Sequence, residues 1–339
     1  MKENDKILLA HGSGGQLMQK LINERILKAF GNDILNRLDD SAELKIPGSS
    51  SRLAFTTDSF VVSPIFFGGG DIGKLAVCGT VNDLSVMGAR PLYLSVGFII
   101  EEGFSFNELD RVISSMKKTA KQAGVKIVCG DTKVVNKGNC DKIFINTSGL
   151  GLLHKKARMS SSKAKPGDLI ILSGTLGEHG IAILSQREGL KFDSPLKSDC
   201  APLHELTSSL EPEFEYIRLM RDPTRGGLAA VVNEIAVSSD VGVEIYEAEV
   251  PLSGTVRAAS EILGIDPLYL ACEGRLVAFV AANRAEKVLR LMMKNKSGRK
   301  ARIIGEVVGK HRKQVYLNTL AGSSRILDIP LQEQMPRIC

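Results

Sequence analysis

The sequence contains no tryptophan, and aromatic residues make up only 5% of its 339 residues. Basic residues cluster mainly at 294–302 and 310–313, without the interleaved aromatic residues on which nucleic-acid bases stack. This pattern disfavours nucleic-acid binding. The formal net charge of +6 is mild, and a solvated face, a phosphorylated ligand or an acidic partner would account for it as well.

The sequence also lacks a hydrophobic run long enough to span a membrane. Its longest apolar stretches, around 92–100 and 276–282, are much shorter than the roughly 18 residues that a spanning helix needs. None of the six cysteines is paired in a Cys-x-x-Cys motif, and the N-terminus does not resemble a signal peptide. We therefore expect a cytoplasmic protein with reduced thiols, no structural zinc and no membrane-embedded part.

Apolar runs and helical patterns alternate along the chain, which is long enough for two cores of about 150 residues each. Strands are expected at 52–57, 91–100, 126–129, 142–153, 169–172, 243–246, 275–281 and 300–308. Helices are expected at 16–30, 71–87, 106–122, 181–187, 202–210, 227–237 and 284–294. The pattern predicts a two-domain α/β protein, with a glycine-rich loop and helix at 1–35, domains at 36–154 and 155–330, and a tail at 331–339.

The chain ends in a cysteine, Cys339, at the end of a segment that disfavours regular structure. Pro330 and Pro336 oppose a helix or a central strand, so 331–339 is expected to form a flexible, extended arm of roughly 30 Å at full stretch. Nothing follows Cys339 that could bury it, and a thiol on such an arm could travel between active sites. A frayed terminus that happens to end in cysteine is the structural alternative.

A glycine-rich loop near the N-terminus, His11-Gly12-Ser13-Gly14-Gly15, leads into the first predicted helix. Such a loop lets backbone N–H groups approach phosphate oxygens, and the helix N-terminus adds a favourable dipole. The motif is neither a P-loop nor a dinucleotide-binding fingerprint, because no Gly-Lys-Ser/Thr follows and no strand of ordinary length precedes it. A flexible N-terminal loop is the alternative interpretation.

Four aspartates stand at the ends of predicted strands or within apolar helices: Asp58, Asp83, Asp131 and Asp222. Burying Asp83 in a helix beside Val81 and Leu84 would be costly, and Mg²⁺ held by carboxylates and nucleotide phosphates would compensate that cost. Each aspartate alone is explained by a turn or a cap. Together they favour a magnesium–nucleotide site. Lys133 and Glu273 also lie next to strand ends, where surface salt bridges are the alternative.

These motifs together resemble the HypE family of hydrogenase maturation factors, within the aminoimidazole ribonucleotide (AIR) synthetase or PurM-like superfamily. The resemblance covers essentially the whole chain and is carried by 11–15, 67–83, 131–134, 222–227 and the terminal Pro-Arg-Ile-Cys at 336–339. It implies that Mg²⁺ is held by Asp58, Asp83, Asp131 and Asp222. The further residues it assigns to ATP and Mg²⁺ binding are His11, Gly12, Gly14, Gly15, Asp71, Lys74, Asn82, Thr224, Arg225, Gly226 and Gly227.

The fold implied by the resemblance is a PurM-like one, with an N-terminal sheet that pairs in a homodimer and a C-terminal α/β sandwich domain. ATP and Mg²⁺ would bind in a cleft between the protomers. The implied activity begins at Cys339, which receives a carbamoyl group from a partner, HypF. The group is dehydrated to a thiocyanate with consumption of ATP, and HypC and HypD pass the cyanide to the iron of nickel–iron hydrogenase. Lys133 and Glu273 would position and deprotonate the tail, and the sequence leaves open which of them acts as the base.

Two alternatives belong to other functional classes. One is a related ATP-dependent enzyme such as selenophosphate synthetase, which would place cysteine or selenocysteine and a lysine where 15–17 read Gly-Gln-Leu. Thiamine monophosphate kinase and the purine-pathway synthetase share the aspartate motifs but have no use for a terminal cysteine. The other alternative is a non-catalytic maturation scaffold whose tail only recruits partners. The complete aspartate set argues against a scaffold.

Overall fold

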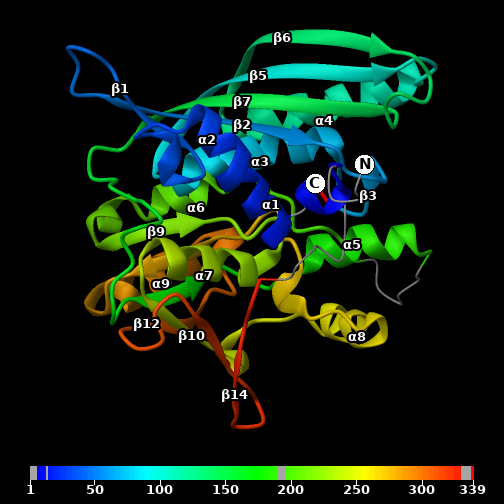
Figure 1. Ribbon diagram of the computed structural model, residues 1–339. Helices are drawn as coiled ribbons and strands as arrows, with labels where there is room; N and C mark the ends of the chain where they lie inside the picture. The colour runs from blue at the N-terminus through cyan, green and yellow to red at the C-terminus, as the bar shows by residue number, and fades with distance from the viewer. Residues whose placement is uncertain (1–5, 13, 190–195, 330–336) are drawn as a thin grey trace.

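The structure, a computed structural model, describes residues 6–12, 14–189, 196–329 and 337–339. These residues form a mixed α/β fold with two domains, each built on its own sheet (Figure 1). The two-domain α/β architecture expected from the sequence is confirmed, while the pairing of the N-terminal sheet in a homodimer stays a prediction. Across the described ranges, no helix combines the length and the apolar character that crossing a bilayer requires.

The first sheet has five strands in the order β1-β2-β7-β5-β6. Neighbouring strands are antiparallel except β5 and β6, which run parallel and are joined through α4. Helices α3 and α4 pack beneath the sheet in Figure 1. The elements are β1 (Ala42–Lys45), β2 (Arg52–Phe60), the short pair β3 (Phe66–Phe67) and β4 (Gly70–Asp71), α3 (Ile72–Val86), β5 (Ala89–Glu101), α4 (Phe106–Ala123), β6 (Lys126–Val135) and β7 (Ile143–Leu153).

The second sheet has seven strands in the order β14-β13-β10-β12-β8-β11-β9. Only β10 and β13 run parallel in it. Its strands are β8 (Leu169–Leu172), β9 (Ile217–Arg221), β10 (Gly242–Tyr246), β11 (Val277–Val280), β12 (Arg302–Val308), β13 (Val315–Asn318) and β14 (Ser324–Ile326). The helices of this half are α5 (Glu178–Arg187), α6 (His204–Ser209), α7 (Gly227–Ser238), α8 (Gly254–Leu263) and α9 (Ala282–Lys294).

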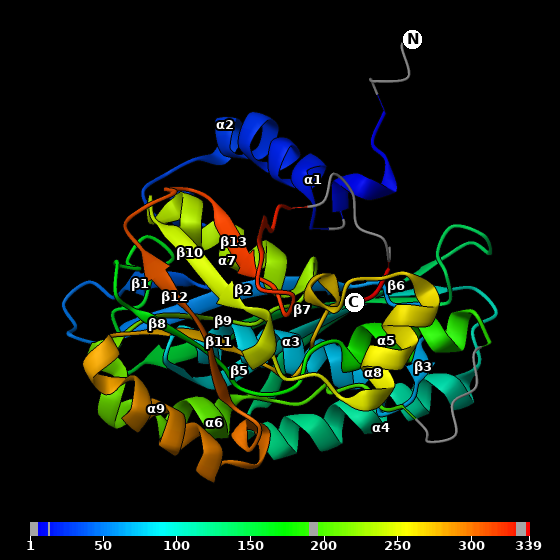
Figure 2. The same cartoon turned by 90° about the horizontal axis from the view of Figure 1, so that it is seen from below.

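Shorter helical segments complete the chain. The N-terminal run predicted at 16–30 is confirmed, and it consists of α1 (Gln16–Leu21), a π-helical segment η3 (Ile22–Ile26) and α2 (Leu27–Phe30). This run stands at the periphery, outside the two sheets (Figure 2). The 3₁₀ turns are η2 (Leu9–Gly12), η4 (Leu35–Arg37), η5 (Glu211–Tyr216), η6 (Glu247–Glu249), η7 (Pro267–Tyr269) and η8 (Lys296–Gly298).

Most of the predicted strands and helices are found, with differences at their ends. Strand β6 continues to Val135, so Asp131 lies within a strand and not after it, and β2 likewise contains Asp58. The sequence did not predict β1, β3, β4, β9, β13, β14 or α8. The six missed strands have only two to five residues each, too few for a period-two pattern to stand out.

Helix α3 lies at the centre of the molecule and fixes the position of the candidate site. Asp71 caps its N-terminus and accepts hydrogen bonds from the backbone N–H groups of Gly73 (2.8 Å) and Lys74 (3.1 Å). All of its residues are buried except Lys74 and Asp83. A helix that is apolar all round must be covered on every side, and α3 packs against the first sheet as well as against α6 and β9 of the second domain.

The last three residues correct one expectation from the sequence. Nothing was expected to bury Cys339, yet its residue is 8% exposed and Ile338 is 1% exposed, both within the same hydrophobic cluster as α3. The C-terminus lies near α5 and β3 in Figure 1. The expectation was wrong because it considered only the chain after Cys339, whereas the cover comes from distant segments. The rest of the predicted arm, 331–336, lies outside the described residues.

Candidate active site

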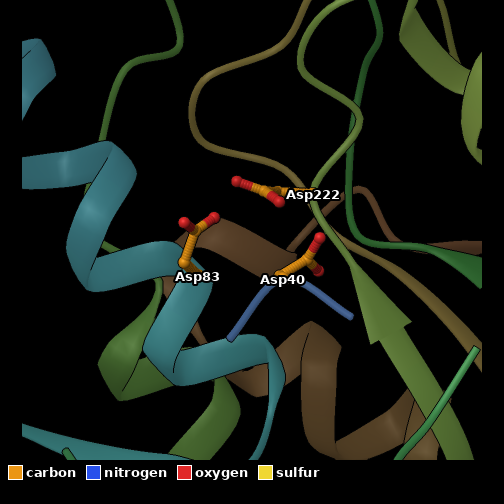
Figure 3. Close-up of side chains that lie close together, drawn as sticks. All are labelled: Asp40, Asp83 and Asp222. Atoms are coloured by element: carbon orange, nitrogen blue, oxygen red, sulfur yellow. The ribbon is translucent and has the colours of Figure 1, made fainter. Parts of the chain in front are cut away.

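Three aspartates from distant parts of the chain meet in the interior of the molecule. Asp40 precedes β1, Asp83 lies on α3 and Asp222 follows β9, and Figure 3 shows their side chains converging. One carboxylate oxygen of each lies within 4.8 Å of the others. Thr56 on β2 joins the group, because its hydroxyl donates to Asp83 Oδ2 at 2.8 Å and lies 3.0 Å from the carbonyl of Asp40.

The three carboxylates line a cavity of about 230 Å³ that also reaches the C-terminus. Asp58 contributes from β2, Glu273 from the loop before β11, and Cys339 from the end of the chain. The other lining residues are Gly14, Met18, Thr56, Thr57, Gly79, Arg221, Thr224, Arg225, Ala230, Val231 and Glu234. The terminal cysteine and a cluster of carboxylates therefore line one cavity, which the sequence alone did not establish.

Burial and mutual repulsion dominate the electrostatics of the cluster. Burial raises the pKa of Asp83 well above its ordinary value, and the neighbouring Asp222, Asp40 and Asp58 raise it further. Burial likewise raises the pKa of Asp40 well above its ordinary value, and the pKa of Asp222 to about 6. Like-charged carboxylates at this separation oppose the ionisation of one another, so the cluster by itself favours bound protons over full negative charge.

Two arginines partly compensate this charge. Arg221 Nε lies 2.6 Å from Asp40 Oδ1, and its other end reaches Glu234 at 3.2 Å. Arg225 lies 3.9 Å from Asp58, a distance at which the attraction is electrostatic and not a short hydrogen bond. The acidic groups of the cluster still outnumber the two guanidinium groups.

The cluster has the chemistry of a divalent cation site. Asp40 Oδ2 is buried and has no hydrogen-bond partner within the part of the chain that the structure describes. An unpartnered buried carboxylate oxygen is costly, and a cation is the ligand that would compensate it. Carboxylate oxygens are also the donors that Mg²⁺ prefers. Asp40, Asp83 and Asp222 therefore fit Mg²⁺.

Two glycine-rich segments meet beside the carboxylates. Gly14 has φ +87°, and a Cβ at this position would lie 2.8 Å from Arg225, so only glycine permits the observed approach. A Cβ on Gly226 would in turn lie 3.3 Å from the Gly14 carbonyl. Gly227 begins α7 just after Thr224 and Arg225 of the cavity wall, and Ala230 in the first turn of this helix also lines the cavity. Backbone N–H groups and a helix dipole at one place favour phosphate.

Glu273 is almost completely buried, and the Asn82 side chain forms a hydrogen bond with its backbone. Its residue is 1% exposed, and Oε1 has no hydrogen-bond partner among the described residues. Burial raises the pKa of Glu273 well above its ordinary value. The Asn82 side chain donates to the backbone carbonyls of Glu273 and Ala201, both at 3.2 Å, and accepts from Leu203 N–H at 2.8 Å. Asn82 thus supports the Glu273 backbone with its own amide fully engaged.

The structure brings some of the predicted site residues together and leaves others apart. Those lining the cavity are Gly14, Asp58, Asp83, Asp222, Thr224, Arg225, Glu273 and Cys339. Asp131 and Lys133 lie on β6, paired with each other at 2.6 Å and exposed to solvent, and they do not line the cavity within one chain. The other predicted residues, His11, Gly12, Gly15, Asp71, Lys74, Asn82, Gly226 and Gly227, are outside the lining set.

Sequence reasoning missed Asp40, Arg221 and Thr56. Asp40 follows Asp39 in a polar turn, where an acidic residue is ordinary, and only its position opposite α3 gives it a role. Arg221 stands next to Asp222, a signal that was available in the sequence but is shared by many surface pairs. The position of Asp40 just before β1 would have indicated a role for it only if β1 had been predicted.

The pKa of Asp222 leads to a testable pH dependence of stability in the protein freed of metal and nucleotide by a chelator. Between about pH 4 and pH 6 the folded state holds a proton on Asp222 that the unfolded state has lost, so the free energy of unfolding falls as the pH rises through this window. The difference amounts to about 3 kcal/mol. Asp222→Asn should therefore be more thermally stable than the wild type at pH 7, and the two should converge below pH 4. A constant difference in melting temperature across this range would contradict the prediction.

Comparison with known proteins gives a consistent result over nearly the whole chain. Residues 38–153 match the family model of the AIR synthase related protein N-terminal domain, and 165–318 match that of the C-terminal domain. Carbamoyl dehydratase HypE of Azotobacter vinelandii is 47% identical over 336 residues, which cover 99% of this chain and 98% of the relative.

Solved structures are similar to the same extent. A crystal structure of a HypE–HypF complex matches with a TM-score of 0.87 and 51% sequence identity, covering 91% of this chain and 99% of the other. A crystal structure of HypE in complex with ATP matches with a TM-score of 0.82 and 48% identity, covering 98% of this chain and 100% of the other.

Proposed function

The chain belongs to the AIR synthase related family, and within it to the HypE carbamoyl dehydratases of hydrogenase maturation, and from this premise we propose a complete reaction for its cavity. In this proposal, ATP drives the dehydration of a carbamoyl group carried on the sulfur of Cys339, and the product is a protein-bound thiocyanate. One observation carries the proposal: Cys339 lines the same cavity as Asp83, Asp222 and Glu273.

The reaction needs a phosphoryl group because an amide oxygen is a very poor leaving group. Transfer of the terminal phosphoryl group of ATP to the carbamoyl oxygen makes it a phosphate ester, and one N–H proton leaves. Loss of inorganic phosphate and of the second N–H proton then leaves sulfur bonded to C≡N. The net change on the cysteine is the loss of one water, whose atoms end in the phosphate and the released protons. The protein must therefore hold phosphates and accept protons.

We assign the phosphates and the cation to neighbouring parts of the cavity. Asp40, Asp83 and Asp222 would hold Mg²⁺, which when bound neutralises charge on the phosphoryl groups. The N-terminus of α7 and the backbone around Gly14 face the same space and would receive the phosphate oxygens. ATP binding is supported by the ATP complex of the 48% identical HypE. Asp131 is exposed on β6 of the same chain, so we assign it a role as a metal ligand only toward the cavity of a partner subunit.

Glu273 is our candidate for the base that accepts the carbamoyl N–H protons. Its carboxyl group is buried, and its raised pKa makes the ionised form a stronger base than an exposed glutamate. It lines the cavity together with Cys339, whereas Lys133 is exposed on β6 of the same chain. Within one protomer only Glu273 of this pair can serve the tail.

We further propose that the first sheet pairs with its counterpart in a homodimer, as the resemblance implied. Exposing large apolar side chains to water costs free energy, which burial against a partner would recover. The large apolar side chains exposed on this sheet in the single chain are Phe55, Tyr93, Ile99, Ile127, Val128 and Val134. Pairing would bring Asp131 and Lys133 of one protomer toward the cavity of its partner. Sedimentation equilibrium tests this, and a monomer at micromolar concentration would contradict it.

Two exchanges with partner proteins complete the proposed cycle. HypF would supply the carbamoyl group, since a 51% identical HypE forms a complex with HypF. A HypC–HypD pair would accept the cyanide for the iron of nickel–iron hydrogenase. Neither a selenophosphate synthetase nor a non-catalytic scaffold has comparable support, because the 47% identical relative from Azotobacter vinelandii is a carbamoyl dehydratase.

Intact-mass measurement tests the proposed reaction directly. After incubation with HypF and its substrates, the chain should gain the mass of one carbamoyl group, and addition of Mg²⁺ and ATP should then remove the mass of one water. In Glu273→Gln the first change should persist while the second slows by about 100-fold, because the substitution keeps the shape and removes the base. Loss of water at the wild-type rate in this variant would exclude Glu273 as the base.

A further inference from the structure

The backbone of the last residues is held by the segment that follows β2. The N–H of Val61 donates to a terminal carboxylate oxygen of Cys339 at 3.1 Å, and the N–H of Ser63 donates to the carbonyl of Arg337 at 3.3 Å. The Arg337 side chain returns a hydrogen bond from Nε to the carbonyl of Val61 at 3.1 Å and forms an ion pair with Asp141 at 2.7 Å. The terminal tripeptide therefore lies alongside 61–63, which holds its backbone by two hydrogen bonds.

Helix α5 supplies two side chains to the same tripeptide. His179 Nε2 lies 2.8 Å from the carbonyl oxygen of Ile338, and the Arg187 guanidinium donates to the carbonyl oxygen of Arg337. These residues are eight positions apart on one helix, slightly more than two turns, so both side chains leave the same face. The Ile338 side chain is 1% exposed and packs in the hydrophobic cluster that contains α3.

Burial lowers the pKa of His179, which favours the neutral ring, and its hydrogen-bond partners then fix the tautomer. A carbonyl oxygen only accepts, so Nε2 must carry the hydrogen that bonds Ile338. Nδ1 then accepts from the Ser198 hydroxyl at 2.8 Å, and that hydroxyl oxygen itself accepts from the N–H of Cys200 at 3.0 Å. The ring is fully buried and packs edge-on against Phe67. A neutral imidazole held at both nitrogens is oriented to donate one hydrogen bond to the tail.

We propose that His179 and Arg187 are positioning residues that dock the C-terminal tripeptide and so set the Cys339 sulfur at the carboxylate cavity. Neither residue lines that cavity, so their effect on the reaction acts through the tail. The inference rests on the proposed function, because it gives the tail an inward pose for dehydration and an outward pose for exchange with partners. The docking contacts are hydrogen bonds to backbone carbonyls together with one buried apolar side chain, which can be broken and reformed in every cycle.

The docked and released poses serve different steps, so a variant that weakens docking should change the rates of the two steps differently. Dehydration needs the docked tail, whereas transfer of the carbamoyl group from HypF needs the released one. Removing a donor from a buried carbonyl weakens the docked state by about ten- to a hundred-fold. His179→Ala should therefore slow the loss of water from carbamoylated Cys339 by at least about tenfold, while the carbamoylation rate is unchanged or higher. A merely structural defect would lower both rates.

Alkylation of Cys339 by iodoacetamide, followed by mass spectrometry of the C-terminal peptide, reports docking without the chemistry. We expect faster alkylation in His179→Ala and in Arg187→Ala than in the wild type. His179→Gln should restore much of the protection, because its side-chain amide can donate near the position of Nε2. His204→Ala, which removes a partly buried histidine on α6 away from the tail, is the matched control and should behave as the wild type.

The outcomes separate this inference from the proposed function. Wild-type alkylation and dehydration rates in His179→Ala and Arg187→Ala would overturn the docking role. If His179→Ala does not fold, the half-buried Arg187 variant carries the same test. If the carbamoylated wild type never loses water with Mg²⁺ and ATP, the proposed function fails, while the alkylation rates still decide whether the two residues dock the tail.

Discussion

Replacing Cys339 by alanine is expected to abolish carbamoylation by HypF and every later step. The reason is chemical: no other atom at this position can form the thioester-like bond to the carbamoyl group, so the loss should be complete and not partial. Intact-mass measurement with HypF, its substrates, Mg²⁺ and ATP should show the unmodified mass throughout. The matched control is Cys140→Ala, which removes a partly buried thiol in the loop before β7 that does not line the cavity, and it should be carbamoylated as the wild type is.

The fold should tolerate this substitution, although Cys339 is buried. Its terminal carboxylate, not its sulfur, accepts the hydrogen bond from Val61, and alanine keeps that carboxylate. Removing one sulfur atom beside an existing cavity costs about 1 kcal/mol. ATP binding should also be retained, because the carboxylates and the α7 N-terminus are untouched. Carbamoylation of Cys339→Ala at any cysteine with subsequent loss of water would show that the cargo is carried elsewhere.

Asp83→Asn is expected to remove ATP-dependent dehydration almost completely while leaving the chain folded and open to carbamoylation. An amide offers one neutral oxygen where the cluster with Asp40 and Asp222 offers a negative charge, so the affinity for Mg²⁺ should collapse. We expect the rate of water loss to fall by about 100-fold or more, since a bound metal ion supplies several kcal/mol to phosphoryl transfer. Single-turnover mass measurement on the carbamoylated protein follows this step alone.

The surrounding contacts indicate that this loss will not come from unfolding. Thr56 donates its hydroxyl hydrogen to Asp83 Oδ2, and the amide oxygen of asparagine can accept the same bond. Burial and neighbouring carboxylates already oppose ionisation of Asp83, so a neutral side chain relieves repulsion. The matched control is Asp110→Asn, the same change at an exposed position on α4. Dehydration at the wild-type rate in Asp83→Asn would remove the cluster from the mechanism and favour a scaffold function.

More of the fold than of the site could be predicted from the sequence. Helix α3 and the long strands β2, β5 and β7 were predictable because each repeats its apolar pattern over many residues. Asp83 could be singled out because a carboxylate in such a helix is anomalous by itself. Asp40 could not, since its side chain becomes unusual only when the turn before β1 packs against α3 and β9. The docked tail was likewise hidden, because its donors at 61–63 and on α5 are far away in the sequence.

The sequence by itself determined the two-domain α/β architecture and the family, because periodic apolar runs and short motifs around glycine and aspartate are local properties that need no partner. Only the tertiary structure decided which carboxylates meet, that Cys339 ends beside them, and that His179 and Arg187 hold the tail there. These are contacts between segments that lie far apart in the sequence. These contacts form because α3 is enclosed between the two domains, and no local pattern in the sequence specifies that arrangement.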